Sequence, residues 1–350
     1  MTIGGCLTDV PGIRLGHHQR RTAGWRTGTT VALLPPGTVG GIDVRGGGPG
    51  TRDTELLHPT ATMDTVHAIC LTGGSAYGLA AAGGVMRHLE ARGIGFAVGP
   101  GGRDVVPIVP SAVIFDLGRG GDFGHRPDES FGERAANAAR ATPSPLGAVG
   151  AGTGARARGL QGGVGTASVT LAHGVVVSAV AVVNAAGSVI DPSTGMPWMP
   201  GRLTLRRPPA SERDALRRHM ETAVPPLNTT IGIVATTAAL TKAECSKFAS
   251  VAHDGLARAI RPVHSLLDGD TIFGVSTGRD QLGSLQNIAA DGSPPQRARV
   301  AWLNAVLEAG ATCFAAACTD AIVHAAATGA DPAYRDLCPS AYPRAFPSAK

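Results

Sequence analysis

Aromatic residues are scarce in this chain. Only 14 of its 350 residues are Phe, Tyr or Trp and 16% are charged, whereas the hydrophobic share reaches 43%. Disordered chains combine low hydrophobicity with high net charge, so the composition excludes that class. Glycine shows no period of three, which excludes a collagen-like fibre. A core with so few rings must be built from Ala, Val, Leu and Ile, packed closely where glycine lets backbones approach.

Metal-binding and disulfide patterns are also missing. The six cysteines form no C-x-x-C motif and are spread over the chain, so the sequence predicts neither a zinc site nor a disulfide framework. The eleven histidines show no H-x-x-x-H pair in a helical context. Residues 147–155, GAVGAGTGA, depart from the dinucleotide fingerprint at Ala155 and are better interpreted as a glycine loop. We therefore expect no metal and no cofactor.

No segment has the pattern of a membrane anchor or a secretion signal. The longest apolar run, near residues 175–186, is shorter than the ~20 residues that a membrane helix needs. The first residues lack a charged region followed by an apolar one. Net charge is +5, and the densest basic stretch, 202–218, contains no aromatic residue for stacking on bases. We expect a cytoplasmic protein that binds neither membrane nor nucleic acid.

Glycine and proline are abundant, with 49 and 25 residues, and they divide the chain into short apolar segments. Periodicity predicts strands at 29–34, 39–44, 66–72, 113–117, 164–171, 175–183 and from 229 onward. It predicts helices at 75–90, 131–141, 212–222, 242–264 and about 296–327. Between about 187 and 227 the chain carries seven prolines and a cluster of arginines, which is typical of an exposed linker.

A glycine pair follows the predicted strand at 66–72. Gly73-Gly74-Ser75 imitates a nucleophile elbow, but Tyr77 takes the place of the final glycine and no suitable Asp and His complete a triad. Ser75 is better interpreted as the N-cap of the following helix. A strand-to-helix step of this kind presents free backbone N–H groups to a ligand or to neighbouring backbone.

The strand that opens with Thr229 carries a stronger chemical signal. It follows Asn228 at the end of the proline-rich segment, and Asp268 and Asp270 lie around Gly269 further along the chain. A Thr at the start of a buried strand is ordinarily a β-former. A Thr that becomes a new N-terminus differs, because its α-amine, with a pKa of about 7.7–8.0, can act as general base for its own hydroxyl. Close carboxylates would orient both groups, although two Asp residues in a turn can also satisfy local N–H groups.

Seven segments, in order between about residues 8 and 327, resemble the P1 (S58) peptidase family. That family includes D-aminopeptidases of the DmpA type, β-peptidyl aminopeptidases and nylon-oligomer hydrolases. The segments are GIDVRGGGPGTRDTELLHP (41–59), LTGGSAYGLAAAGGVMRHLE (71–90), VVPIVPSAVIFDL (105–117), GAGTGARARGLQGGVGTAS (150–168), VVNAAGSVIDPSTG (182–195), NTTIGIVAT (228–236) and HDGLARAIRPVHSLLDGDTIF (253–273). The resemblance implies an α+β fold, a four-layer αββα sandwich similar to the Ntn hydrolases but differently connected.

The resemblance also implies that an inactive precursor cleaves itself. In threonine-type members the bond before the nucleophile is Asn–Thr, which matches Asn228–Thr229 and would divide the single domain 1–350 into subunits 1–228 and 229–350. The family's two following carboxylates match Asp268 and Asp270. Its asparagine in the VNA motif matches Asn184, whose side chain would stabilise the oxyanion.

Gln161 departs from the family pattern. Related sequences usually carry a lysine near the GTG segment or in a K-G-G motif, where this chain has Gln161. Arg156 and Arg158 are the nearby positive charges, but Arg and Lys are not interchangeable at a close site. The departure puts activity and substrate range in question. Candidates for support of the loop or the oxyanion are Gly73, Gly74, Ser75 and Gln161.

The expected function is a self-processing amidohydrolase or aminopeptidase that acts on small amides, peptides or oligoamides. One alternative is a silent homologue that never matures and serves as a binding or structural protein, which Gln161 favours. Another is an acyltransferase, since an ornithine acetyltransferase family shares this kind of fold and a threonine nucleophile. The resemblance further implies a homo-oligomer, a tetramer of α/β pairs.

Overall fold

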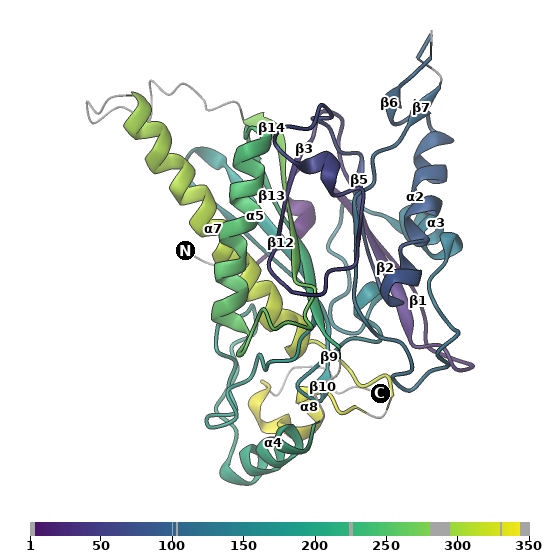
Figure 1. Ribbon diagram of the computed structural model, residues 1–350. Helices are drawn as coiled ribbons and strands as arrows, with labels where there is room; N and C mark the ends of the chain where they lie inside the picture. Colours follow the sequence, from purple (N-terminus) through teal and green to yellow (C-terminus); the bar gives the residue numbers. More distant parts are fainter. Residues whose placement is uncertain are drawn as a thin grey trace.

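Two stacked β-sheets, each covered by helices on its outer side, form the body of the protein (Figure 1). The computed structural model describes residues 4–99, 101–102, 104–223, 227–280, 295–329 and 331–343. Three hydrophobic clusters lie between successive layers: helices on the first sheet, sheet on sheet, and the second sheet on its helices. The order of layers is therefore αββα, as the sequence predicts.

The first sheet has the strand order β1-β2-β5-β8-β4. Adjacent strands in this sheet are antiparallel, except that β5 and β8 are parallel. Helices α2 and α3 pack on its outer face, where apolar side chains of β2 and β5 meet alanines and valines of the helices. The elements are β1 (Arg14–Arg20), β2 (Thr27–Leu33), β4 (Thr51–Arg52), β5 (Ala68–Thr72), β8 (Ser111–Val113), α2 (Ala81–Glu90) and α3 (Glu129–Ala138).

The second sheet has the strand order β11-β12-β13-β14-β3 and carries the candidate site. Strand β13 pairs antiparallel with β12 and parallel with β14, to which α5 connects it. The almost continuous apolar run of β12 is buried on both faces, because the other sheet lies on one side and α7 on the other. The elements are β3 (Val39–Val44), β11 (Gly163–Thr170), β12 (Val176–Asn184), β13 (Thr229–Ala238), β14 (Thr271–Asp280), α5 (Lys242–Ala259) and α7 (Pro295–Val323).

Small side chains let the layers approach closely. At Gly165 in β11, an added Cβ would lie 2.0 Å from the carbonyl oxygen of Ala317 in α7, so only glycine fits there. The cluster between the sheets consists mainly of Leu, Val, Ile and Ala, with Phe273 as its one buried aromatic among the described residues. The core is thus built as the composition predicts.

Helix α7 belongs to the core, although its length and apolar composition would also suit a membrane-spanning helix. Among the described residues it is the one helix long and apolar enough to cross a membrane, over Arg297–Val323, with a mean hydropathy of 1.5. Of its most apolar window, 89% is buried inside the protein. The run near residues 175–186 is therefore not the longest apolar segment.

The remaining elements are short or peripheral. In Figure 1, α4 and α8 lie at the lower end near β9 and β10, and the β6–β7 hairpin projects from the opposite end. The helices are α1 (Ser75–Gly78), α4 (Ala210–Thr222), α8 (Tyr334–Leu337) and the 3-10 turns η1 (Leu7–Asp9), η2 (Glu55–Leu57), η3 (Gly150–Gly152), η4 (Ala172–Gly174) and η5 (Pro339–Ala341). The strands are β6 (Phe96–Ala97), β7 (Val105–Val106), β9 (Arg156–Ala157) and β10 (Leu160–Gln161).

Several boundaries differ from the sequence predictions. The predicted helix 75–90 is two helices, α1 and α2. The predicted helix 242–264 ends at Ala259, because Pro262 removes a backbone donor. Edge strand β1 was not predicted, since its sequence RLGHHQR is largely polar. The expected linker 187–227 is less exposed than its composition suggests: residues 187–190 are buried, and α4 buries Leu216 and Met220.

Candidate active site

Strand pairing brings the predicted site residues to one end of the second sheet. Thr229 is the first residue of β13, and Asn184, the last residue of β12, lies directly opposite it in the ladder. On the other side, Asn228 forms an isolated parallel bridge with Asp268, just before β14 begins. Residues 184, 228–229 and 268–270, which are far apart in the sequence, therefore meet at one place.

The Thr229 hydroxyl is buried and has two contacts. It donates to the carbonyl oxygen of Asn228, the residue that precedes it, and it accepts a hydrogen bond of 3.2 Å from the backbone N–H of Gly269. Only 5% of Thr229 is exposed. The hydroxyl oxygen therefore lies beside the carbonyl of the Asn228–Thr229 peptide bond.

Asp270 holds the start of β13 in place. One carboxylate oxygen accepts from the N–H of Thr230 at 2.7 Å. The other accepts from His264, from Nδ1 at 2.8 Å and from the backbone N–H at 3.3 Å. His264 was not singled out from the sequence, because its segment was interpreted only as the end of a helix. The structure adds it to the site as a direct partner of Asp270.

Asp268 has a more local environment. Its carboxylate accepts from the backbone N–H of Ser265 at 2.7 Å, and its carbonyl oxygen accepts from Gly48 N–H at 2.8 Å. The glycine-rich loop 46–48 packs tightly here, since a Cβ at Gly46 would lie 2.2 Å from the Asp268 carbonyl oxygen. Burial, and then the neighbouring charge of Asp270, raise the pKa of the Asp268 carboxyl.

Asp268→Asn is expected to raise Tm at pH 7 relative to the wild type. A carboxyl whose pKa is raised by folding adds stability that is complete below its ordinary pKa and is lost as pH rises through the folded-state value. Asn carries no charge and escapes that loss. Thermal melts from pH 3 to 8 should show the advantage growing as pH rises from the ordinary Asp pKa through the raised one, and constant above it. The exposed Asp214→Asn, paired with Arg217 on α4, is the control, and an Asp268→Asn Tm at or below wild type would contradict the expectation.

The Asn184 side chain is oriented by groups from three segments. Its Oδ1 accepts from the backbone N–H of Arg156 at 3.0 Å and from the Arg119 guanidinium, and its Nδ2 donates to the Phe115 carbonyl at 3.3 Å. A primary amide has two N–H donors, and among the described residues the Phe115 carbonyl is the one acceptor found for them. Arg119 was missed from the sequence because it lies in a glycine loop without a recognisable pattern.

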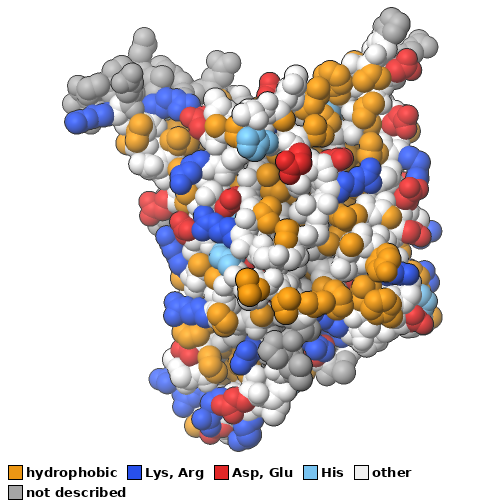
Figure 2. Space-filling view, viewed as in Figure 1, with side chains coloured by type: hydrophobic (Ala, Val, Ile, Leu, Met, Phe, Trp, Pro, Cys, Tyr) orange, Lys and Arg blue, Asp and Glu red, His pale blue; other side chains and the backbone are white. Residues whose placement is uncertain are grey.

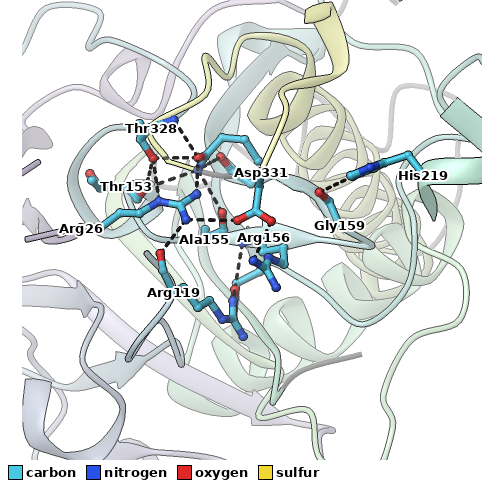
Figure 3. Close-up of polar contacts among 12 residues, drawn as sticks. Arg26, Arg119, Thr153, Ala155, Arg156, Gly159, His219, Thr328 and Asp331 are labelled. Atoms are coloured by element: carbon cyan, nitrogen blue, oxygen red, sulfur yellow. Dashed lines mark hydrogen bonds and ion pairs between the residues drawn. The ribbon is translucent and has the colours of Figure 1, made fainter. Parts of the chain in front are cut away.

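Gln161 is fully buried in a cluster of polar groups, and Figure 3 labels its partners Arg26, Ala155 and Thr328. Its Oε1 accepts from the Arg26 guanidinium at 2.8 Å and from the Thr328 hydroxyl at 2.7 Å, and its Nε2 donates to the carbonyl of Ala155 at 3.0 Å. These bonds secure the turn that carries Arg156, whose N–H holds Asn184. Gln161 thus supports the Asn184 loop indirectly, and no contact between it and Thr229 is found among the described residues.

The glycine turn at Gly73 to Ser75 is satisfied within the protein. The N–H groups of residues 73, 74 and 75 donate to Gly28 O at 2.9 Å, Asp116 Oδ1 at 2.7 Å and Ile114 O at 3.0 Å. Two of the three acceptors are neighbouring backbone carbonyls, which is one of the two outcomes that the sequence predicts, and these three bonds leave none of the three N–H groups for a ligand. Ser75 is also not a cap, since Gly74 holds the N-cap position without a side-chain bond and Ser75 has φ of 52°. Burial raises the pKa of Asp116, which the sequence did not suggest, to about 6.

Apolar side chains flank this end of the sheet. Leu227 precedes Asn228 and is 43% exposed, while Leu266 and Leu267 precede Asp268 and are 87% and 63% exposed. Figure 2 shows hydrophobic side chains gathered across the middle of the face in view, with many Lys and Arg side chains along its left side and base.

All six cysteines are buried free thiols, and no metal-binding cluster is found in the described part of the chain.

The αββα order of layers is that of the Ntn-hydrolase fold. The fold resembles that of a Burkholderia sp. beta-aminopeptidase, with a TM-score of 0.67 and 26% identity over 96% of this chain and 92% of that one. It also resembles the L-aminopeptidase D-Ala-esterase/amidase of Ochrobactrum anthropi, titled a new variant among the Ntn hydrolase fold, with a TM-score of 0.66 and 18% identity over 93% of this chain and 88% of that one.

Sequence comparison gives the family. Residues 5–333 match the model of peptidase family S58, and the chain belongs to that family. It is 49% identical to an uncharacterized aminopeptidase of Mycobacterium tuberculosis, over 96% of this chain and 98% of the relative. It is 32% identical to the 6-aminohexanoate-oligomer endohydrolase of Paenarthrobacter ureafaciens, over 86% of this chain and 85% of the relative. The protein is thus a peptidase, an enzyme that hydrolyses amide bonds, and the family predicted from the sequence segments is confirmed.

Proposed function

We propose that this protein is an autoproteolytic amide hydrolase whose nucleophile is the Thr229 hydroxyl, freed as a new N-terminus by cleavage after Asn228. The position of that hydroxyl beside the Asn228 carbonyl carries the proposal. Attack of the oxygen on the carbonyl carbon breaks the C–N bond, and the hydroxyl proton passes to the Thr229 nitrogen. Water then hydrolyses the resulting ester and releases the Asn228 carboxylate.

The mature site repeats the same chemistry on a substrate. The Thr229 amine accepts the hydroxyl proton as the oxygen attacks the substrate carbonyl, and it gives that proton to the leaving amine. The free N–H of the Asn184 amide donates to the oxyanion, while Asp270 holds the start of β13. Water hydrolyses the acyl ester and restores the threonine.

Small peptides and linear oligoamides are the proposed substrates. The named relatives include aminopeptidases and a 6-aminohexanoate-oligomer endohydrolase, which both act on amide bonds. The exposed Leu227, Leu266 and Leu267 beside the site suit apolar stretches of such chains.

A denaturing gel with N-terminal sequencing tests the proposal. The 35.3 kDa chain should mature into pieces of about 23 and 12 kDa, in proportion to the lengths of 1–228 and 229–350, and the smaller should begin Thr-Thr-Ile-Gly. An intact chain that hydrolyses amides would indicate another nucleophile. An intact chain without activity would favour the silent homologue.

Asp270→Asn is expected to slow self-cleavage or kcat at least tenfold, about 1.4 kcal/mol in activation free energy. The carboxylate accepts from Thr230 and from His264. An amide nitrogen would face one of these donors, so the start of β13 would shift. Time courses of chain cleavage and of anilide hydrolysis measure the effect. Asp254→Asn, on the exposed face of α5, is the control, and wild-type rates for Asp270→Asn would remove Asp270 from the mechanism.

A further inference from the structure

The intact chain shows where the acyl part of a substrate lies. In self-cleavage, residues up to Asn228 are the acyl side of the bond that Thr229 attacks, so a later substrate places its own acyl chain at the same position. Arg119 contacts this segment at two points: its Nη2 donates to the carbonyl oxygen of Leu227, and the same nitrogen lies 3.4 Å from Asn228 Oδ1. Its Nη1 donates to Asn184. Arg119 therefore binds the Leu227 carbonyl, which belongs to the amide bond that precedes the proposed cleavage site.

The positive charge of Arg119 is buried and lacks a direct carboxylate partner. Arg119 is 6% exposed, and within the described residues its guanidinium forms no ion pair. The two neighbouring arginines instead share Asp331, Arg26 at 3.1 Å and Arg156 at 2.6 Å (Figure 3). Burial lowers the pKa of Arg119 to about 10, opposed by Asp116 and Asp331 and reinforced by the other two arginines. It stays protonated at neutral pH.

We infer that Arg119 selects substrates that carry a carbonyl at the position of Leu227 O, namely internal amide bonds and N-acylated residues, over substrates with a free amino group there. A neutral carbonyl accepts from the guanidinium as Leu227 does. An ammonium group at the start of the acyl chain would lie next to a buried cation that forms no ion pair of its own among the described residues, and the two positive charges would repel each other. The inference rests on the proposed function and makes the enzyme endo-acting.

Three anilides with the same leaving group test the inference on the wild-type, self-cleaved enzyme. They are N-acetylasparagine p-nitroanilide, asparagine p-nitroanilide with a free amine, and succinamoyl p-nitroanilide, which lacks the amine nitrogen. The N-acetyl compound should have a kcat/KM at least tenfold above that of the free amine, with the succinamoyl compound between them. A free-amine substrate hydrolysed as fast as or faster than the N-acetyl one would overturn the inference. So would a self-cleaved enzyme that hydrolyses none of the three.

Variants assign the preference to Arg119. Arg119→Gln keeps a donor but removes the charge, and the N-acetyl over free-amine ratio should fall to below threefold, mainly through KM. Arg217→Gln, on the exposed face of α4, should keep the wild-type ratio. An unchanged ratio in Arg119→Gln would reject the assignment.

Arg119→Gln also removes contacts to Leu227 and Asn228, so it can affect self-cleavage. A second measurement therefore uses only the wild-type enzyme. N-acetyl-L-asparagine and L-asparagine are compared as inhibitors of the wild-type enzyme. The acetylated acid should have an inhibition constant at least tenfold lower, and equal constants would count against the inference. The gel of the same preparation reports self-cleavage separately, so failure of the proposed function is distinguished from failure of this selectivity.

Discussion

Thr229→Ala is expected to leave a full-length, folded chain that neither cleaves itself nor hydrolyses amides, with turnover lowered at least about a thousandfold. The hydroxyl is the group that lies beside the Asn228 carbonyl, and Ala has nothing to replace it. Stability should fall little, because the hydroxyl's other contact is one bond from Gly269 N–H and such a bond contributes about 1 kcal/mol. A gel, an anilide assay and a thermal melt on the same preparation measure the three outcomes.

Thr230→Val is the matched control for this variant. Among the described residues the buried Thr230 hydroxyl has no hydrogen-bond partner. Asp270 binds the backbone N–H of this residue, which Val retains. Thr230→Val should therefore cleave and turn over at the wild-type rate. If Thr230→Val stays intact while Thr229→Ala is cleaved, the nucleophile lies one residue further along.

Asn184→Ala is expected to lower kcat by two to three orders of magnitude, about the effect of removing one oxyanion donor, with a smaller change in KM. Among the described residues the Asn184 amide is held by Arg119, Arg156 and Phe115, which leave one of its N–H groups without an acceptor. The Asn184 backbone lies opposite Thr229 in the ladder. A donor so placed acts on charge that develops only in the transition state. Steady-state kinetics on a series of anilides give the separate effects on kcat and KM.

Asn184→Asp separates the donor role from the positioning role. Asp keeps an acceptor for Arg119 and for the Arg156 N–H but has no N–H for the oxyanion, so its kcat should fall as far as that of Ala. Ser178→Ala, in the same strand with a single 3.3 Å bond to Leu7 O, should keep wild-type kinetics. Retention of more than a tenth of kcat in both Asn184 variants would exclude Asn184 as the oxyanion donor.

Strands and layers could be predicted because their signals are local. The apolar runs of β12 and β13 and the capping box that opens α5 at Thr241 depend on residues a few positions apart. Errors arose where a distant group intervened. Ser75 has a suitable side chain for a helix cap, but Gly74 takes the N-cap position, and its N–H donates to Asp116 in the segment after β8.

The sequence by itself determined the family, the αββα fold, the enzyme class and the residues that meet at the end of the second sheet. Each of these depends on local periodicity or on motifs that recur in order along the chain. The tertiary structure alone decided how those residues are held. Arg119 reaches Asn184 across 65 positions and Leu227 across 108, while His264 turns back onto Asp270. No local pattern marks such partners, because a hydrogen bond depends on which side chains the folded sheets bring within about 3 Å of each other.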